Sequence, residues 1–365
     1  MTGVLVHEWI AQSGGSENVL QVMADIYPDA DILCLWNDST GRFDPRRVRE
    51  SWLARTPLRK SKALALPFMP ATWARRPGRD YDWALVSSHL FAHHVRFDKR
   101  DVRRYVYVHS PARYIWTPEL DRRGSGPIAR SVAAALKPLD RRRARETREF
   151  ATNSEFVRRR VADAWGVEAR VIHPPVEVTR IQQTEDWAAE SSPDETQVLD
   201  SLPPEFVLGA SRFIPYKRLE EAIRAGEVSG LPVVIAGNGP ELDFLRARAE
   251  RSSVPVQFVL SPSTPMLYAL YRRCSVFVFP AVEDFGIMPV EAMAAGAPVV
   301  ANAIGGAAES VVPGVTGALT DFASDRDVEQ AVRDAMATQR NDRLERARTF
   351  SRERFVREVE GWVGA

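Results

Sequence analysis

The feature that most constrains this chain is the alternation of short apolar runs with helical patterns through its second half. Strands that alternate with helices at this spacing form βαβ units, because neighbouring parallel strands need a crossover connection. The pattern predicts a doubly wound α/β domain with a parallel sheet of about six strands. The apolar runs read EFVLGAS, LPVVIAG, VPVQFVL, SVFVFPA and APVVAN, and the helical patterns read RLEEAIRAG, PELDFLRARAE, PMLYALYRR and PVEAMAAG.

The first half contains a less regular version of the same alternation, with candidate strands GVLVH, ADILCLW, DWALVSS, RYVYVHS, EFATNS and ARVIHP. A chain of 365 residues is long for one core, since domains average roughly 150 residues. Residues 174–204 are polar, flanked by prolines and without a hydrophobic period, so we place the interdomain connection there. The sequence predicts two Rossmann-like domains, residues 1–175 and 176–345. A C-terminal helix over 346–365 is expected to dock back on the first domain.

Two such domains are expected to face each other across a cleft at the carboxyl ends of their sheets. Open α/β folds bind ligands at that edge. The functional site should therefore be assembled from strand-to-helix loops of both halves.

Composition points to a soluble globular protein, with 45% hydrophobic and 27% charged residues. The chain start lacks a basic n-region, and no apolar run reaches the roughly 18 residues of a spanning helix. Neither secretion nor a transmembrane anchor is expected, which favours a cytoplasmic location. Cys34 and Cys274 lie in separate apolar stretches, and we interpret them as reduced core thiols rather than metal ligands.

Charge is distributed unevenly along the chain. Residues 1–180 carry 31 Lys and Arg against 21 Asp and Glu, a balance of +10, and the remainder carries 18 against 27, a balance of −9. Residues 55–79 hold seven Lys or Arg, no acid, and several large apolar side chains. This mixture suits either a surface that lies on anionic lipid, peripheral to the inner face of a membrane, or a solvated acceptor loop. Prolines interrupt any long helix in it.

The stretch EDFGIMPVEAMAAGAPVV places two glutamates, Glu283 and Glu291, eight positions apart between a predicted strand and a predicted helix. The loop leads into a helix start, where free backbone N–H groups and the helix dipole favour a phosphate. A glycosidase pair would need one protonated and one ionised carboxyl across the scissile bond, and nothing else in the sequence requires that arrangement. A structural reading makes Glu291 a first-turn acid and Glu283 a solvated loop residue.

The segment EDFGIMPVEAMAAGAPVVANAIGGAAESVVPGVTGAL resembles the E-x7-E motif of the GT4 family of retaining glycosyltransferases, which have the GT-B fold. GASRFIPYKRLEEAI resembles the family's G-R-L-x-x-x-K segment, IAGNGPELDFL its G-x-G-P turn, and SGGSENVL its amino-terminal Gly-Gly loop. The resemblance is strong from about residue 205 to 320 and weaker before it.

The resemblance assigns roles to residues of the second half. Arg212 and Lys217 would place positive charge on the donor diphosphate as the glycosidic bond breaks. Glu291 would accept hydrogen bonds from the nucleotide ribose, and Glu283 would contact the donor sugar. Backbone N–H groups would hold sugar and phosphate at Phe285, Gly286 and Ile287.

In the first half, the resemblance points to the Gly-Gly loop and to a strand that ends in a histidine. Gly14 and Gly15 would allow the donor diphosphate to approach the backbone closely, although a plain tight turn explains them equally well. His109 would contact the donor sugar and place a backbone carbonyl on the reacting face. His89 and Ser110 are candidates for the acceptor or sugar side.

The resemblance implies a metal-independent, retaining hexosyltransferase that takes part in polysaccharide biosynthesis and uses a nucleotide diphosphate sugar as co-substrate, with no cofactor. GDP-mannose is favoured, because the motifs look closest to bacterial O-antigen mannosyltransferase-like members. The acceptor would be a glycan, a lipid-linked glycan or a small molecule, and no nucleic acid partner is expected. The alternatives are a GT-B sugar-nucleotide epimerase and a non-catalytic protein that binds membranes or nucleic acid. A Rossmann dehydrogenase is disfavoured, since GNGPEL lacks the third glycine of its fingerprint.

Overall fold

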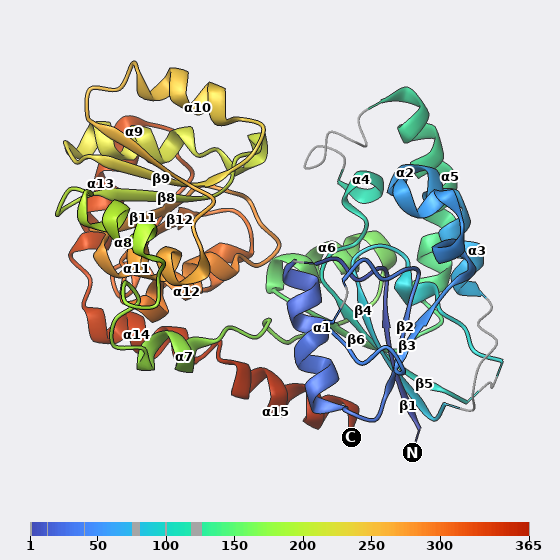
Figure 1. Ribbon diagram of the computed structural model, residues 1–365. Helices are drawn as coiled ribbons and strands as arrows, with labels where there is room; N and C mark the ends of the chain where they lie inside the picture. The colour runs from blue at the N-terminus through green and yellow to red at the C-terminus, as the bar shows by residue number, and fades with distance from the viewer. Residues whose placement is uncertain are drawn as a thin grey trace. The chain divides into compact units, whose positions relative to one another are not determined.

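The computed structural model describes residues 2–12, 14–39, 41–74, 81–98, 101–117 and 126–364. The chain divides into two compact units. The first contains residues 1–175 together with the segment from Phe355 onward, and the second contains Val176–Arg354. Each unit has its own parallel sheet flanked by helices (Figure 1). This architecture is the predicted GT-B α/β fold.

The sheet of the first unit has seven parallel strands in the order β3-β2-β1-β4-β5-β6-β7. All six candidate strands of the sequence are present. The additional edge strand β3 was missed, because its sequence VRE is short and polar. The strands are β1 (Gly3–His7), β2 (Asp31–Cys34), β3 (Val48–Glu50), β4 (Trp83–Ser88), β5 (Arg103–Val108), β6 (Glu149–Thr152) and β7 (Arg170–Val171).

The helices of the first unit cover two apolar sheet faces. The central strands β1, β4 and β5 have fully buried residues on both faces of the sheet, for example Val4, Leu85 and Val106. The α-helices are α1 (Gly15–Ile26), α2 (Lys62–Ala65), α3 (Met69–Ala74), α4 (Arg113–Trp116), α5 (Pro127–Ala144), α6 (Glu155–Trp165) and α15 (Arg352–Val363), and the 3-10 turns are η1 (Trp52–Arg55), η2 (Pro57–Lys60), η3 (Leu66–Phe68) and η4 (Ala92–His94).

The sheet of the second unit has six parallel strands in the order β10-β9-β8-β11-β12-β13. The five apolar runs named above form five of them, and the sixth, β13, has the short sequence GALT. The strands are β8 (Val207–Arg212), β9 (Val233–Asn238), β10 (Val256–Leu260), β11 (Val276–Phe279), β12 (Val299–Asn302) and β13 (Gly317–Thr320). The helices are α7 (Val178–Gln183), α8 (Pro193–Asp200), α9 (Glu220–Ser229), α10 (Leu242–Ala249), α11 (Thr264–Arg273), α12 (Ile287–Ala295), α13 (Asp325–Met336) and α14 (Arg340–Arg348), with 3-10 turns η7 (Pro215–Lys217) and η8 (Gly306–Glu309).

Most of the segment 174–204, for which the sequence predicts an interdomain connection, folds as part of the second unit. It forms α7 and α8, and Ile181, Trp187 and Leu199 are buried in the apolar core of that unit. Ser192 and Glu195 form a capping box at the start of α8, which explains why so polar a segment is helical.

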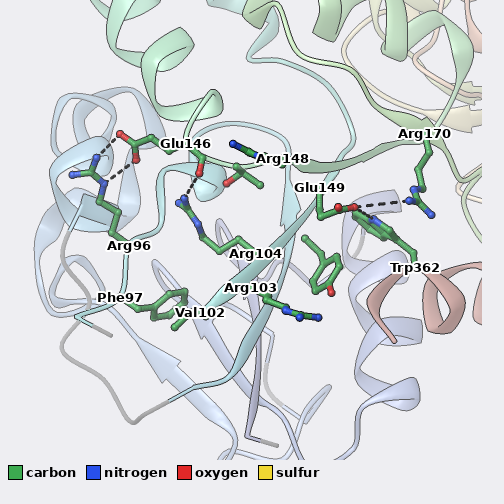
Figure 2. Close-up of a pocket in the computed structure, with 12 residues that line it drawn as sticks. Arg96, Phe97, Val102, Arg103, Arg104, Glu146, Arg148, Glu149, Arg170 and Trp362 are labelled. Atoms are coloured by element: carbon green, nitrogen blue, oxygen red, sulfur yellow. Dashed lines mark hydrogen bonds and ion pairs between the residues drawn. The ribbon is translucent and has the colours of Figure 1, made fainter. Parts of the chain in front are cut away.

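The C-terminal segment contributes to both units. Phe350 is buried in the core of the second unit, whereas Phe355, Val359 and Trp362 are buried in the core of the first. Trp362 also donates a hydrogen bond from Nε1 to Glu149 Oε2 at 3.2 Å (Figure 2). Helix α15 is therefore held in the first unit by apolar packing and by a polar contact.

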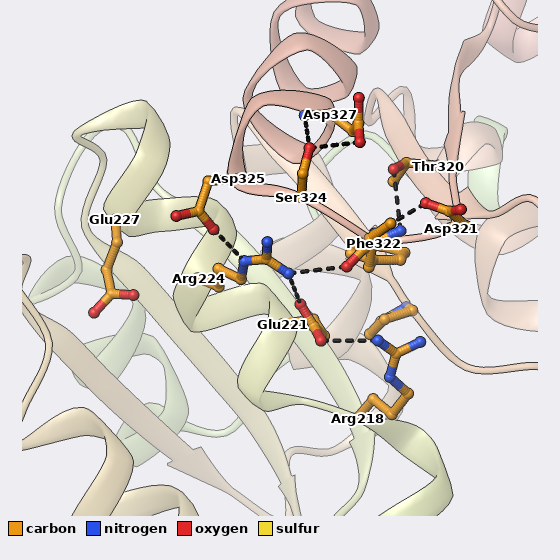
Figure 3. Close-up of polar contacts among 12 residues, drawn as sticks. Arg218, Glu221, Arg224, Glu227, Thr320, Asp321, Phe322, Ser324, Asp325 and Asp327 are labelled. Atoms are coloured by element: carbon orange, nitrogen blue, oxygen red, sulfur yellow. Dashed lines mark hydrogen bonds and ion pairs between the residues drawn. The ribbon is translucent and has the colours of Figure 1, made fainter.

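A polar network joins α9 to the segment between β13 and α13 in the second unit (Figure 3). Arg224 donates to Glu221 at 3.1 Å, to Asp325 at 2.5 Å and to the backbone carbonyl of Phe322 at 2.9 Å. Glu221 also accepts a hydrogen bond from Arg218 at 2.8 Å. The network fixes Arg218, the residue that follows η7, and so supports the loop that carries Lys217.

Two further sequence-based expectations can be compared with the structure. Cys34 and Cys274 are buried and unpaired with each other, as predicted for core thiols. Among the residues that the structure describes, no helix combines the length and the apolar character needed to span a bilayer.

Candidate active site

The topology of the second unit determines where its candidate residues meet. In the strand order, β8 lies between β9 and β11, so the connections leave toward opposite sides at this point. A crevice for ligands forms at such a switch point, outside the carboxyl ends of the strands. Arg212 is the last residue of β8, and Glu283 lies in the loop after β11. Lys217 and Arg212, which lie 66 and 71 positions before Glu283 in the sequence, are thereby brought to the same edge of the sheet as Glu283.

Lys217 and Glu283 form a direct ion pair between Nζ and Oε1. Both side chains are largely buried, with 10% and 15% of the side-chain surface exposed. The Lys217 ammonium also lies 5.6 Å from the centre of the Phe279 ring. Glu283 thus compensates the positive charge of a lysine that is positioned at the switch point.

Arg212 supplies a second positive charge at the same loop. Its Nη2 atom donates to the Tyr216 hydroxyl at 3.4 Å, and it has no carboxylate partner among the described residues. Arg212 is exposed. Its guanidinium group is therefore available to an anionic ligand, whereas the charge of Lys217 is already neutralised.

Glycines hold the loop after β11 in place. Gly306 donates its backbone N–H to the Glu283 carbonyl at 2.8 Å. A Cβ atom at Gly306 would lie 2.1 Å from the Asp284 carbonyl oxygen, a distance that no side chain tolerates. The neighbouring Gly305 has φ +109°, which also favours glycine. Any residue with a side chain at position 306 would therefore displace the backbone of Asp284 and Phe285, which directly follow Glu283.

Helix α12 starts where the sequence predicts an anion site. Its N-cap is Gly286, with φ 87° and no side-chain capping bond, and Ile287 is the first helical residue. The first backbone N–H groups of a helix have no partner within it, and the dipole makes this end positive. Phe285 is buried and packs 5.6 Å from Phe350, measured between ring centres. The helix start is thus open to a ligand and anchored in the core.

Glu291 is the fifth residue of α12 and lies in its second turn, not in the first turn as the sequence interpretation had it. Its Oε1 atom accepts a hydrogen bond from the Tyr268 hydroxyl of α11 at 3.2 Å. Burial raises the pKa of Glu291 to about 7, although the bond from Tyr268 opposes the rise. The carboxyl is consequently half protonated near neutral pH and fully ionised only in more basic solution.

The first unit has an equivalent switch point between β1 and β4. The residues at the carboxyl ends of these strands are His7 and Glu8 on one side, and Ser87, Ser88 and His89 on the other. The topology therefore brings together two segments that are about 80 residues apart.

Glu8 is fully buried and organises the turn after β4. Its Oε1 atom accepts backbone N–H groups from His89, Leu90 and Ala92 at 3.1, 2.8 and 2.9 Å. Its Oε2 atom lies 3.1 Å from His89 Nδ1. Burial alone would raise the pKa of Glu8, but His89, His7 and the backbone N–H groups hold it below the ordinary value. An ionised Glu8 thus orients the ring of His89, whose side chain is 22% exposed.

His109 directly follows β5, as the sequence predicted for a strand end. Its Nε2 atom lies 2.8 Å from Ser87 Oγ, which in turn lies 3.1 Å from His7 Nδ1. Burial, together with His89 and His7, holds the pKa of His109 well below its usual range. Burial also lowers the pKa of His7 to about 4. Both imidazoles are therefore neutral at pH 7, which suits hydrogen bonding to an uncharged sugar.

Two other candidates of the first unit are engaged with the protein itself. The Ser110 hydroxyl donates to the backbone carbonyl of Pro111 at 2.8 Å. The backbone carbonyl of His109, for which a catalytic position was predicted, accepts a hydrogen bond from Asn153 Nδ2 at 3.0 Å. Gly14 is the N-cap of α1, and the helix begins at Gly15, so the Gly-Gly pair lies at a helix start.

His93 and His94 have a structural role in the first unit. Both Nε2 atoms lie close to Asp140 Oδ1 of α5, at 3.0 and 2.8 Å. The other carboxylate oxygen, Oδ2, accepts hydrogen bonds from the Nε1 atoms of Trp116 and Trp165, both at 2.7 Å. Asp140 is fully buried. One carboxylate thus lies against four ring nitrogens in the core, and three of them hydrogen-bond to it.

The sequence analysis missed Glu8, His7, Ser87, Tyr268 and Asp140. A usable signal existed for Glu8 and His7, because the dipeptide His-Glu stands at the carboxyl end of the first strand of a doubly wound sheet. Tyr268 and Asp140 lie within helical patterns, where their distant partners leave no local trace in the sequence.

Comparison with known proteins agrees with this geometry. Residues 193–354 match the family model described as "Glycosyl transferases group 1". The match lies entirely within the second unit and includes Arg212, Lys217, Glu283 and Glu291.

Curated relatives and solved structures agree with the family match. A GDP-mannose-dependent alpha-(1-6)-phosphatidylinositol monomannoside mannosyltransferase of Mycolicibacterium smegmatis is 32% identical over 202 residues, 51% of this chain and 52% of the relative. A D-inositol 3-phosphate glycosyltransferase of the same species is 33% identical over 163 residues, 41% of this chain and 36% of the relative. The crystal structure of Anabaena Alr3699/HepE in complex with UDP-glucose has a TM-score of 0.69 at 18% identity, with both chains covered in full.

The fold and the family match define the class as far as they reach: the chain has the predicted GT-B α/β fold, and residues 193–354 of its second unit match the glycosyl transferases of group 1. Curated proteins among its sequence relatives include the mannosyltransferase and the inositol phosphate glycosyltransferase named above. The chain spans about half the length of the mannosyltransferase that it matches.

Proposed function

We propose that the chain transfers a hexosyl unit from a nucleotide diphosphate sugar to a hydroxyl group of its acceptor, with retention of configuration and without a metal ion. The proposal rests chiefly on the Lys217–Glu283 pair beside the open start of α12. Such a site offers positive charge to a diphosphate and a carboxylate to sugar hydroxyls. The second unit would bind the donor, and the first unit would bind the acceptor.

In the proposed reaction, the bond between the anomeric carbon and the diphosphate oxygen breaks while a bond to the acceptor oxygen forms on the same face. The acceptor proton passes to the leaving diphosphate, so no protein base is required. Arg212 and Lys217 stabilise the negative charge that develops on that diphosphate. Glu283, released from Lys217 by the donor, accepts hydrogen bonds from the sugar. Neutral His109 holds a sugar hydroxyl.

The proposed donor is GDP-mannose, and the proposed acceptor is a lipid-linked or small molecule that carries a sugar or cyclitol. The support comes from the names of sequence relatives, which specify GDP-mannose, phosphatidylinositol monomannoside and inositol 3-phosphate. The identity of about 32% over half the chain makes these names a guide to substrate class.

A thermal-shift panel of GDP, UDP, ADP and dTDP tests the donor. At 100 times its Kd, the cognate nucleotide should stabilise the protein by about 2.7 kcal/mol, while the other three stabilise it little. The cognate shift should be larger at pH 8 than at pH 6. Glu291, with its pKa of about 7, is ionised at pH 8 and can then accept from both ribose hydroxyls.

Glu291→Gln is the matched variant for this panel, because it keeps the shape of the side chain without the charge. It should lose most of the nucleotide-induced shift and the difference between the two pH values. Glu309, an acid of the same unit in η8, provides the control substitution Glu309→Gln. A flat response of the natural chain to all four nucleotides would contradict the proposed donor class.

We also propose that the first unit contacts an anionic membrane through the segment from η1 to η3. Trp52, Leu64 and Phe68 are exposed by 52%, 64% and 45%, although they are large and apolar. Trp52 and Phe68 contact each other edge to face at 6.2 Å between ring centres. Lys60 and Lys62 lie on the same segment. Arg55 and Arg59 of the predicted stretch also lie on this segment, whereas Arg75, Arg76 and Arg79 lie outside the described residues.

Vesicle co-sedimentation checks this membrane contact. The full chain should bind vesicles that contain anionic phosphatidylglycerol and should not bind pure phosphatidylcholine. The triple substitution Trp52→Ser, Leu64→Ser and Phe68→Ser should reduce the bound fraction severalfold without lowering Tm, because these side chains are already exposed. Phe244→Ser, at a similarly exposed position of the second unit, should bind normally. Unchanged binding of the triple variant would refute the proposed surface.

A further inference from the structure

A cavity of about 640 Å³ opens in the first unit at the amino-terminal ends of three neighbouring strands (Figure 2). Arg103 begins β5, Glu149 begins β6 and Arg170 begins β7, and all three line the cavity together with Trp362 of α15. Six of the twelve lining residues lie on these strands and on α15, and the other six lie in the adjoining connections.

The cavity lies at the opposite edge of the sheet from the histidine cluster. Strand β5 runs from Arg103 to Val108, and His109 follows directly. At about 3.3 Å per residue, the strand separates the two ends by roughly 17 Å. A ligand in this cavity would therefore be a different molecule from one that contacts His109.

Positive charge is in excess around the cavity. Five arginines line it against two glutamates, Glu146 and Glu149, which leaves a formal surplus of three positive charges. Its volume is within the range of small-molecule sites. The arginines are Arg96, Arg103, Arg104, Arg148 and Arg170.

The two glutamates leave several of these arginines uncompensated. Arg96 pairs with Glu146, its Nε atom donating to Oε2 at 2.9 Å. Arg170 lies 3.8 Å from Glu149, at the outer limit of an ion pair. Arg103 and Arg148 are exposed and form no ion pair with any residue that the structure describes.

Arg104 lies close to other positively charged side chains. It donates to the backbone carbonyls of Glu146 and Val95 at 2.7 and 3.0 Å, which satisfies its N–H groups without neutralising its charge. Burial, with Arg96 and Arg143 nearby, lowers the pKa of Arg104 despite the attraction of Glu146. A single carboxylate thus serves three guanidinium groups, and an added anion would relieve their repulsion.

We propose that this cavity binds a phosphate-bearing anion with two or three negative charges, either a soluble phosphorylated metabolite or a phospholipid headgroup. Guanidinium groups bind phosphate oxygens in a bidentate manner, which lysines do not. Arg103 and Arg148 bind the anion directly, and Arg104 adds charge from the cavity wall. The site is separate from the donor site of the second unit and does not depend on the proposed reaction.

Isothermal titration of the full chain with inorganic pyrophosphate tests the site. Arg103→Ala combined with Arg148→Ala should weaken binding at this site at least tenfold. Both side chains are exposed and unpaired, so Tm should stay within about one degree. The matched control, Arg159→Ala combined with Arg326→Ala, removes two exposed arginines outside the cavity and should bind as the natural chain does.

Pyrophosphate is expected at the donor site as well, so a second variant separates the two sites. Arg212→Ala combined with Lys217→Ala should retain the binding event that depends on Arg103 and Arg148. Vesicles that contain phosphatidic acid form the other arm, and their binding by the same arginines would identify a headgroup as the ligand. If the loss of Arg103 and Arg148 weakens the binding of neither pyrophosphate nor vesicles with phosphatidic acid, the proposed site is refuted.

Discussion

Replacing Lys217 by alanine should lower kcat for glycosyl transfer by about 10²- to 10³-fold, the usual loss when one preorganised charge at a reacting oxygen is removed. The Lys217 ammonium is held between Glu283 and the Phe279 ring at the switch point of the second sheet. No water molecule could replace so fixed a charge when the diphosphate departs. The measurement is the initial rate at saturating donor and acceptor.

The loss of Lys217 also leaves Glu283 without its main partner, and that effect must be separated from catalysis. Lys217→Ala combined with Glu283→Gln removes both charges, so Tm should recover toward that of the natural chain while the rate stays low. Arg246→Ala removes an exposed positive charge from α10 in the same unit and should leave both rate and Tm unchanged. A Lys217→Ala variant that keeps more than a tenth of the natural kcat would exclude Lys217 from the reaction.

Replacing Asp140 by alanine should destabilise the first unit by about 3–5 kcal/mol, because several buried ring N–H donors would lose a charged acceptor and each buried donor left unpaired costs roughly 1–3 kcal/mol. His94, Trp116 and Trp165 would each lose their hydrogen-bond acceptor, and His93 would lose the carboxylate oxygen that lies 3.0 Å from its Nε2 atom. A loss of this size should lower Tm by roughly 10 °C. Thermal or urea unfolding measured by circular dichroism provides the value.

Asp140→Asn tests the same prediction with the shape of the side chain conserved. Its amide group presents N–H donors to ring N–H donors, so the variant should also be destabilised. Asp163→Ala, at an exposed position of α6, should change Tm by less than about one degree. If Asp140→Ala unfolded at the natural temperature, the hydrogen bonds to Asp140 would have no net effect on stability.

Much of the fold could be predicted because buried parallel strands are continuous apolar runs. Runs such as VFVF in β11 are visible in the sequence, whereas VRE in β3 is polar and GALT in β13 is short. The boundary between the two units falls within the predicted segment 174–204, but its helices were not predicted, because α7 and α8 bury only a few large residues, such as Ile181 and Leu199. Short helices with so few apolar residues produce no clear period.

Only the part of the candidate site that lies within local sequence motifs could be predicted from the sequence. Glu283 and Glu291 lie in one loop and helix, and the sequence shows their spacing directly. The Lys217–Glu283 pair joins residues 66 positions apart, and Glu8 accepts hydrogen bonds from residues more than 80 positions away. Such pairings follow from the strand order of the two sheets, which one sequence does not specify.

The packing of α15 affects the order in which the protein can fold during synthesis. The rings of Trp362 and Phe355 pack against Tyr105 and Tyr107 of β5, at 5.5 and 5.8 Å between ring centres. These tyrosines are translated some 250 residues earlier than the helix that covers them. The emerging first unit must therefore keep an apolar face uncovered on the ribosome while the whole second unit is made. A chaperone that recognises exposed aromatic surface would find its target there, and a fragment that ends at Pro175 would retain that exposure permanently.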